Sequence, residues 1–129
     1  MNKTIISILL SFALALGING MVLADADHNE AVEKMAKIMI NLNHRPSSSE
    51  REWLVKVAGD SSQPAHIRTM AQAIANLEHR ASAADKAKLK EVINDGSVDE
   101  NERNLARIIH DLNHMPSSSD KQTLRAMMD

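Results

Sequence analysis

The sequence predicts an all-α fold, in which three stacked helix–turn–helix hairpins follow a cleaved signal peptide. The main observation behind this prediction is an internal repeat: segments 41–50, 76–85 and 111–120 share one pattern around a Leu-x-His motif. Both steps are 35 residues long and contain no gap. Apolar residues at helical spacing and a serine before each shorter helix support the same fold. A fixed period of this size is typical of helical repeats that stack on one another.

Residues 1–26 have the features of a signal peptide that is removed on export. Lys3 supplies a positive charge near the start, and a mostly apolar run over 5–18 follows it. Ala24 and Ala26 offer two positions for cleavage. The chain has no cysteine, and an exported domain of this size without disulfides suits the bacterial periplasm. We therefore expect a periplasmic or secreted bacterial protein whose mature chain does not span a membrane.

The mature chain is expected to form one domain, residues 27–129, with repeats at about 27–61, 62–96 and 97–129. The formal charge of the full chain is −2, and its basic and acidic residues alternate without forming a run. It has no tyrosine, and its single phenylalanine lies in the predicted signal peptide. Such a chain lacks both the basic surface and the stacking rings of a nucleic-acid-binding protein.

Each repeat is predicted to begin with a longer helix. The apolar residues recur at spacings of three and four, which places them on one helical face. The three sets are Val32, Met35, Ala36, Met39 and Leu42, then Ile67, Met70, Ala71, Ile74 and Leu77, then Leu105, Ala106, Ile109 and Leu112. A stripe this wide suits a helix that packs between neighbours. Met35 and Met39 have a spacing that can suit copper(I), but we interpret them as core filling.

A shorter helix is predicted in the second half of each repeat. The apolar residues of these helices are Leu54, Val57 and Ala58, then Leu89, Val92 and Ile93, then Leu124, Met127 and Met128. Ser47, Ser82 and Ser117 each stand three residues before an acidic residue, as in a capping box, and we expect them to be structural helix caps. By the same reasoning, Ser62 and Ser97 are expected to cap the second and third longer helices.

Three histidines occupy one position of the repeat, at the end of each longer helix: His44, His79 and His114. We expect them to be structural caps, because an imidazole suits the free carbonyls and partial negative charge of a helix C-terminus. A shared metal ion is the alternative. In a translation-like stack, however, equivalent atoms lie at least about 8–10 Å apart, too far to share an ion unless the hairpins close into a ring.

His110 and His114 are a more specific candidate for metal binding, because they lie four residues apart on one helical face. The first two repeats have Ile40 and Ala75 at the position of His110. Two imidazoles supply only two ligands, so we expect at most weak binding of copper, zinc or nickel. His28 and His66 fall in first turns of the longer helices and are expected to be surface residues.

Trp53, Met127 and Met128 are candidates for contact with a protein or peptide partner. Trp53 is the only tryptophan, and Lys88 and Thr123 replace it in the other repeats, so the shared core does not require it. The two methionines lie at the open end of the last repeat, which has no further neighbour to cover it.

No catalytic constellation is apparent, because the serines near histidine recur at three equivalent positions and no cysteine is present. The sequence therefore favours an exported, non-enzymatic binding module that engages a protein or peptide. A periplasmic metal-binding or metal-stress protein that uses histidine and methionine is the first alternative. A carrier of a small apolar ligand, held between hairpins, is the second.

Overall fold

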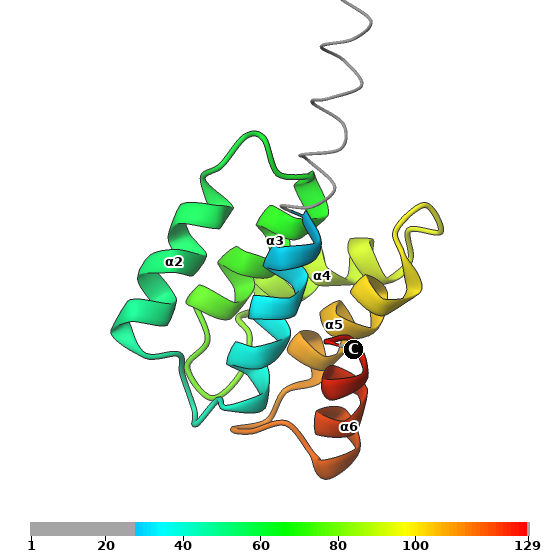
Figure 1. Ribbon diagram of the computed structural model, residues 1–129. Coiled ribbons are helices and arrows are strands. Elements are labelled where there is room, and N and C mark those ends of the chain that lie inside the picture. Colours follow the sequence, from blue (N-terminus) through cyan, green and yellow to red (C-terminus); the bar gives the residue numbers. More distant parts are fainter. Residues whose placement is uncertain (1–27, 129) are drawn as a thin grey trace, which may run out of the picture.

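The computed structural model describes residues 28–128, and in this range all regular secondary structure is helical, which confirms the all-α prediction (Figure 1). The helices are a first helix, described over 28–40, then α2 (Ser48–Ala58), α3 (Ala65–Ala75), α4 (Ala83–Ile93), α5 (Glu100–Asp111) and α6 (Ser118–Ala126). The predicted signal peptide, residues 1–26, lies outside the described residues. Within them, no helix has the length and apolar character needed to cross a membrane.

The three helices predicted as the longer ones, 28–40, α3 and α5, form the centre of the molecule and run in the same direction (Figure 1). The predicted difference in length is absent in the second repeat, where α3 and α4 have 11 residues each; the names longer and shorter helices are kept for the first and second helix of each repeat. Side chains near their starts converge, since ligand atoms of His28, His66 and Glu102 lie within 4.8 Å of one another. The connections that leave their ends also converge, at the three repeat histidines. Helices α2, α4 and α6 return along the outside.

The hairpins close into a ring, which differs from the open stack that the repeat predicts. The His44 N–H donates to the His114 carbonyl at 3.1 Å, the His79 N–H to that of His44 at 2.9 Å, and the His114 N–H to that of His79 at 2.8 Å. The first connection is therefore bonded to the third as well as to the second. Helix α2 also packs against α3, and α4 against α5, across the expected boundaries between repeats.

The core lies between the longer helices and receives a few apolar side chains from each shorter one. Its largest fully buried side chains are Met35, Met39, Leu54, Ile67, Met70, Ile74, Leu77, Leu89, Leu105, Ile109 and Leu124. All three methionines of this set are 0 % exposed, so they pack against apolar neighbours and offer no sulfur to a metal at the surface.

The shorter helices begin at serine caps. Ser47 Oγ accepts from the Glu50 N–H at 3.2 Å, Ser82 Oγ from the Asp85 N–H at 3.1 Å, and Ser117 Oγ from the Asp120 N–H at 3.0 Å. These bonds satisfy amides that the first helical turn leaves free.

The starts of the longer helices differ from prediction. The N-cap of α3 is Pro64 and that of α5 is Asp99, so the expected caps Ser62 and Ser97 are wrong. Ser62 donates both its N–H and its hydroxyl to Asp60, and Ser97 does the same to Asp95. These serines belong to the turn that precedes each helix. There the carboxylate of an aspartate two residues earlier accepts from the serine N–H and hydroxyl, so the serine does not cap the helix.

Candidate metal centre

The repeat histidines lie in the connections that follow the longer helices, and their backbone has an uncommon conformation. The φ angles of His44, His79 and His114 are 72°, 71° and 69°, in the left-handed region that non-glycine residues seldom adopt. The residues on either side of each histidine form an isolated antiparallel bridge, for example Asn43 with Arg45. This tight reversal, repeated three times, turns each imidazole toward a common axis.

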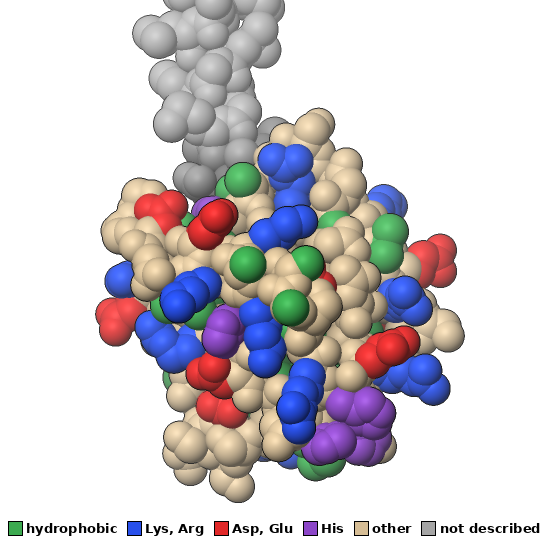
Figure 2. Space-filling model, turned by 180° about the vertical axis from the view of Figure 1, so that it is seen from behind, with side chains coloured by type: hydrophobic (Ala, Val, Ile, Leu, Met, Phe, Trp, Pro, Cys, Tyr) green, Lys and Arg blue, Asp and Glu red, His purple; other side chains and the backbone are tan. Residues whose placement is uncertain are grey.

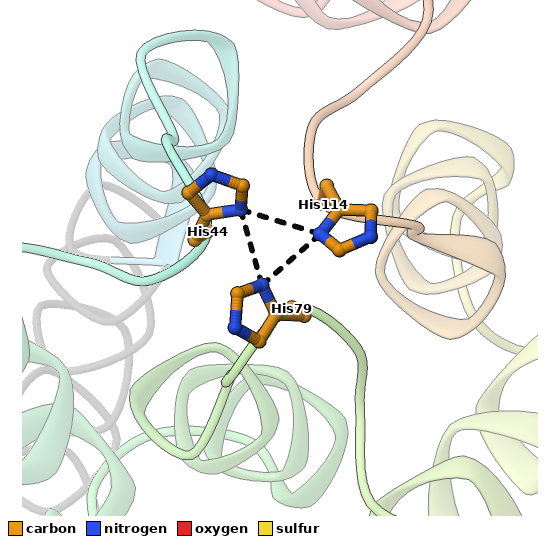
Figure 3. Close-up of side chains that lie close together, drawn as sticks. All are labelled: His44, His79 and His114. Atoms are coloured by element: carbon orange, nitrogen blue, oxygen red, sulfur yellow. Dashed lines mark hydrogen bonds between the residues drawn. The ribbon is translucent and has the colours of Figure 1, made fainter.

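The three imidazole rings meet at that axis, as Figure 3 shows. Their Nδ1 atoms are 3.1 Å apart between His44 and His79, 3.0 Å between His79 and His114, and 3.3 Å between His114 and His44. The separation of about 8–10 Å expected for a translation-like stack is therefore wrong. Ring closure brings together atoms that lie 35 and 70 residues apart in the chain.

Hydrogen bonds alone do not satisfy this triangle of nitrogens. Each Nδ1 atom carries either a proton or a lone pair in the plane of its ring. With three nitrogens and two states, at least two must match, so at least one contact joins two protons or two lone pairs. A cation on the axis removes the conflict, because it accepts all three lone pairs while each ring keeps its proton on Nε2.

The spacing of the nitrogens suits a transition-metal ion. With bonds of about 2.0–2.1 Å, neighbouring nitrogen ligands are about 3.3–3.4 Å apart in a tetrahedral site and about 2.9 Å apart in an octahedral one. The observed distances of 3.0, 3.1 and 3.3 Å fall between these values. Three donors on one side of the ion leave at least one coordination position open.

The open position faces solvent, since all three histidines are exposed. Figure 2 shows histidine side chains gathered in one patch on the molecular surface. A hollow of about 410 Å³ adjoins His44 and His79 and is also lined by Asn43, Arg45 and Glu78. Water, a small anion or a side chain of another molecule can therefore reach an ion held there.

Unlike the three serines, the three repeat histidines form, within the described part of the chain, no hydrogen bond typical of a helix cap through their side chains. Each histidine uses its backbone N–H and carbonyl in the bond ring that joins the connections, and its imidazole faces the other two imidazoles. The rings therefore face one another, and among the described residues no hydrogen bond joins one of them to a carbonyl at a helix end. Their role as helix caps stays a prediction.

His110 does not lie with His114. It is the penultimate residue of α5, and its Nδ1 atom is 2.7 Å from Oδ1 of its neighbour Asp111. His114 lies beyond the helix end, where the connection turns it toward His44 and His79. The helical spacing behind the predicted pair does not apply, because the helix ends at Asp111.

The candidate partner-binding residues are partly covered. Trp53 packs against the core, and the Lys34 Nζ atom lies 4.4 Å from the centroid of its ring. Met127 and Met128 are also half-buried against the core. In the described part of the chain, the large exposed apolar side chains are Val55 and Met115, which are far apart in sequence.

Sequence reasoning found the equivalence of the three histidines but missed their convergence. The available signal was the exact 35-residue spacing of the three histidines within the chain, since an insertion in one connection would move one histidine away from the other two. No protein-family model, no curated protein and no solved structure matches the chain. The site is therefore interpreted from its own geometry.

Proposed function

We propose that this protein binds a divalent transition-metal ion on the axis of its helical ring, through the Nδ1 atoms of His44, His79 and His114. The observation that supports the proposal is the triangle of Nδ1 atoms, 3.0–3.3 Å on each side, which hydrogen bonds cannot satisfy. The role is one of binding and involves no chemical step. Binding would take place in the periplasm or outside the cell, because the N-terminal segment predicts that the protein is exported.

The donor set favours zinc, copper(II) and nickel, for which imidazole is a good ligand. Copper(II) should bind most tightly, because it has the highest affinity of the divalent first-row ions for such ligands. In the described residues, no hydrogen bond reaches the Nε2 atoms of these rings. Without a partner that orients each ring, affinity should fall short of that of a buried structural zinc site.

The sequence-based hypothesis of a protein- or peptide-binding module stays a prediction. The geometry gives it one route, through the open position of the bound ion, where a partner's side chain can complete the coordination. The hypothesis of a small apolar carrier has less support. The hollow of about 630 Å³ at the opposite end of the bundle is lined mainly by polar and charged side chains.

Isothermal titration of untagged protein with zinc and copper(II) tests the metal proposal. We compare the wild type with His79→Asn, since asparagine tolerates the left-handed backbone but removes the imidazole. His110→Asn is the matched control, because it removes a nearby histidine that lies outside the cluster.

The expected result is that His79→Asn weakens metal binding at the axis at least about a hundredfold, while His110→Asn has no effect. Equal binding by the wild type and His79→Asn would refute the axial site. Loss of binding only in His110→Asn would restore the pair that the helical spacing predicts.

A further inference from the structure

A second cluster of ligand-type side chains lies at the other end of the longer helices. It consists of His28, the first described residue of helix 28–40, with His66 in the first turn of α3 and Glu102 in the first turn of α5. The α3 helix between the two ends is 11 residues long, so the clusters are separated by about 16 Å or more. This cluster is independent of the axial histidines, since the two share no residue.

Glu102 departs from the repeat in a way that the core does not explain. At steps of 35 residues, its counterparts are Val32 and Ile67, both buried apolar residues. Glu102 is only 5 % exposed, and a buried carboxylate is costly unless it is paired. An acid at a core position of one repeat therefore indicates a role for the acid itself.

Both oxygens of Glu102 face imidazoles. His28 Nε2 contacts Oε1, and His66 Nε2 lies 3.2 Å from Oε2. The two rings are 5.5 Å apart between centroids, and their side chains are each 21 % exposed. His28 and His66 are expected to be surface residues, and both are indeed partly exposed, but the fold also brings each ring into contact with the buried acid.

One side of the cluster is open to solvent and is not covered by atoms of the described residues. It lines a hollow of about 630 Å³, whose wall also contains Glu33, Asp99 and Asn101. The hollow gives an ion access from solvent and leaves room for further ligands. Two imidazoles and one carboxylate from three separate helices form a ligand set found in zinc and non-haem iron sites.

The charge of Glu102 is central to this site. The N-termini of α3 and α5 lie here, and their partial positive charges oppose a cation. The carboxylate offsets that field and supplies an oxygen ligand, while Glu33 and Asp99 add negative charge to the wall of the hollow. The same field favours an anion as an additional ligand of a bound ion.

We propose that His28, His66 and Glu102 form a second metal site, which binds a divalent first-row ion and leaves coordination positions open toward the hollow. Its mixed nitrogen and oxygen ligands should accept zinc and, more readily than the all-nitrogen axial site, manganese or iron(II). The experiment must distinguish this site from a structural ion pair, in which the same three residues contact one another and bind no metal.

The test is isothermal titration of the untagged protein with zinc. Wild type should bind two ions, and His79→Asn, which disables the axial site, should bind one. Adding Glu102→Gln to His79→Asn should weaken the remaining site at least about a hundredfold, because glutamine removes the charge but keeps the shape. His66→Ala serves as an independent variant that removes a different ligand.

Glu102→Val guards against a folding artefact, because it places at this position the residue that the first repeat carries. It should fold, retain one ion at the axis, and lose the second. Absence of zinc binding by His79→Asn, with one ion bound by the wild type, would overturn the second site and leave the axial site standing. Unchanged binding after Glu102→Gln would also overturn it and favour the structural ion pair. If the wild type binds one ion, and that ion is retained in His79→Asn but lost when Glu102→Gln is added, the axial site is overturned instead.

Discussion

The three histidines with positive φ are the residues on which the candidate metal centre depends. Histidine tolerates the left-handed conformation better than most side chains, though less well than glycine or asparagine. Glycine would fit the turn but supply no ligand. The presence of histidine at all three turns therefore places a metal ligand where backbone geometry alone would favour another residue, which is the pattern expected of a functional site.

The first prediction separates this backbone effect from metal binding. In metal-free protein, His79→Ala should lower the free energy of unfolding by about 1 kcal/mol more than His79→Asn, because alanine gains nothing that offsets its left-handed conformation. Both variants should lose axial zinc binding equally. Urea denaturation in the presence of EDTA measures the first quantity. Equal stability of the two variants would contradict the conformation of this turn.

Two aspartates in the turns before α3 and α5 supply a pH-dependent contribution. The hydroxyl and the N–H of Ser62 donate to Asp60 and hold the pKa of that carboxyl below its usual value of 3.8. Ser97 lowers the pKa of Asp95 from the same value in the same way. Since the folded-state pKa is lower than the unfolded one, this stabilisation is present above about pH 4 and disappears as the pH falls through the folded-state pKa.

The second prediction follows from that sign. A double variant, Asp60→Asn with Asp95→Asn, should be less stable than wild type at pH 7, and the difference should shrink toward pH 2. Urea denaturation at several pH values between 2 and 7, without metal, measures it. A difference that stays constant over this range would show that the charges of these carboxylates are irrelevant to the turns.

At the scale of the helix, the three serine caps have the same position but different surroundings. Ser47 and Ser117 each form a reciprocal capping box with the acid three residues on. At the second repeat, the Ser82 hydroxyl donates to Asp85 Oδ2 at 3.0 Å, and Asp85 is only 6 % exposed. Asn76 Nδ2 is its other donor, at 3.2 Å.

The third prediction is that the caps are unequal. Ser117→Ala should cost about 1 kcal/mol, the usual value for a lost cap. Ser82→Ala should cost about 2 kcal/mol, because it also removes a donor from a buried carboxylate. Denaturant unfolding of both variants decides this. Equal losses would mean that the Ser82 hydroxyl adds nothing beyond the cap itself.

The helices could be predicted from local patterns, while their closure into a ring could not. Leu54, Leu89 and Leu124 show helical spacing with their neighbours, and the serine caps are visible in the sequence because both are properties of one segment. Ring closure depends on how far each connection rotates the chain. That rotation comes from a left-handed φ at His44, His79 and His114, which no sequence pattern marks at a residue other than glycine.

For the molecule as a whole, parallel packing of the longer helices creates two unlike ends. The end that carries His44, His79 and His114 follows three helix C-termini, whose partial negative charges favour a cation. The end that carries Glu102 lies at the N-termini of α3 and α5, and it has a buried carboxylate of its own. The two candidate sites should therefore differ in ion preference, although both draw one ligand from each repeat.

The last prediction concerns the coupling of the axial ion to the stability of the ring. The three connections meet only in the folded state, so an ion bound by all three stabilises that state by mass action. In the Glu102→Val background, where only the axial site remains, zinc at a hundred times its Kd should raise the free energy of unfolding by about 2.7 kcal/mol. Trp53, the only tryptophan, packs against the core and reports unfolding by fluorescence.

The zinc-dependent increment should disappear with EDTA, which removes the ion, and with His44→Asn, which removes one of its three ligands. His110→Asn should leave it intact. An increment that is equally large in His44→Asn would show that zinc stabilises the protein from somewhere other than the axis.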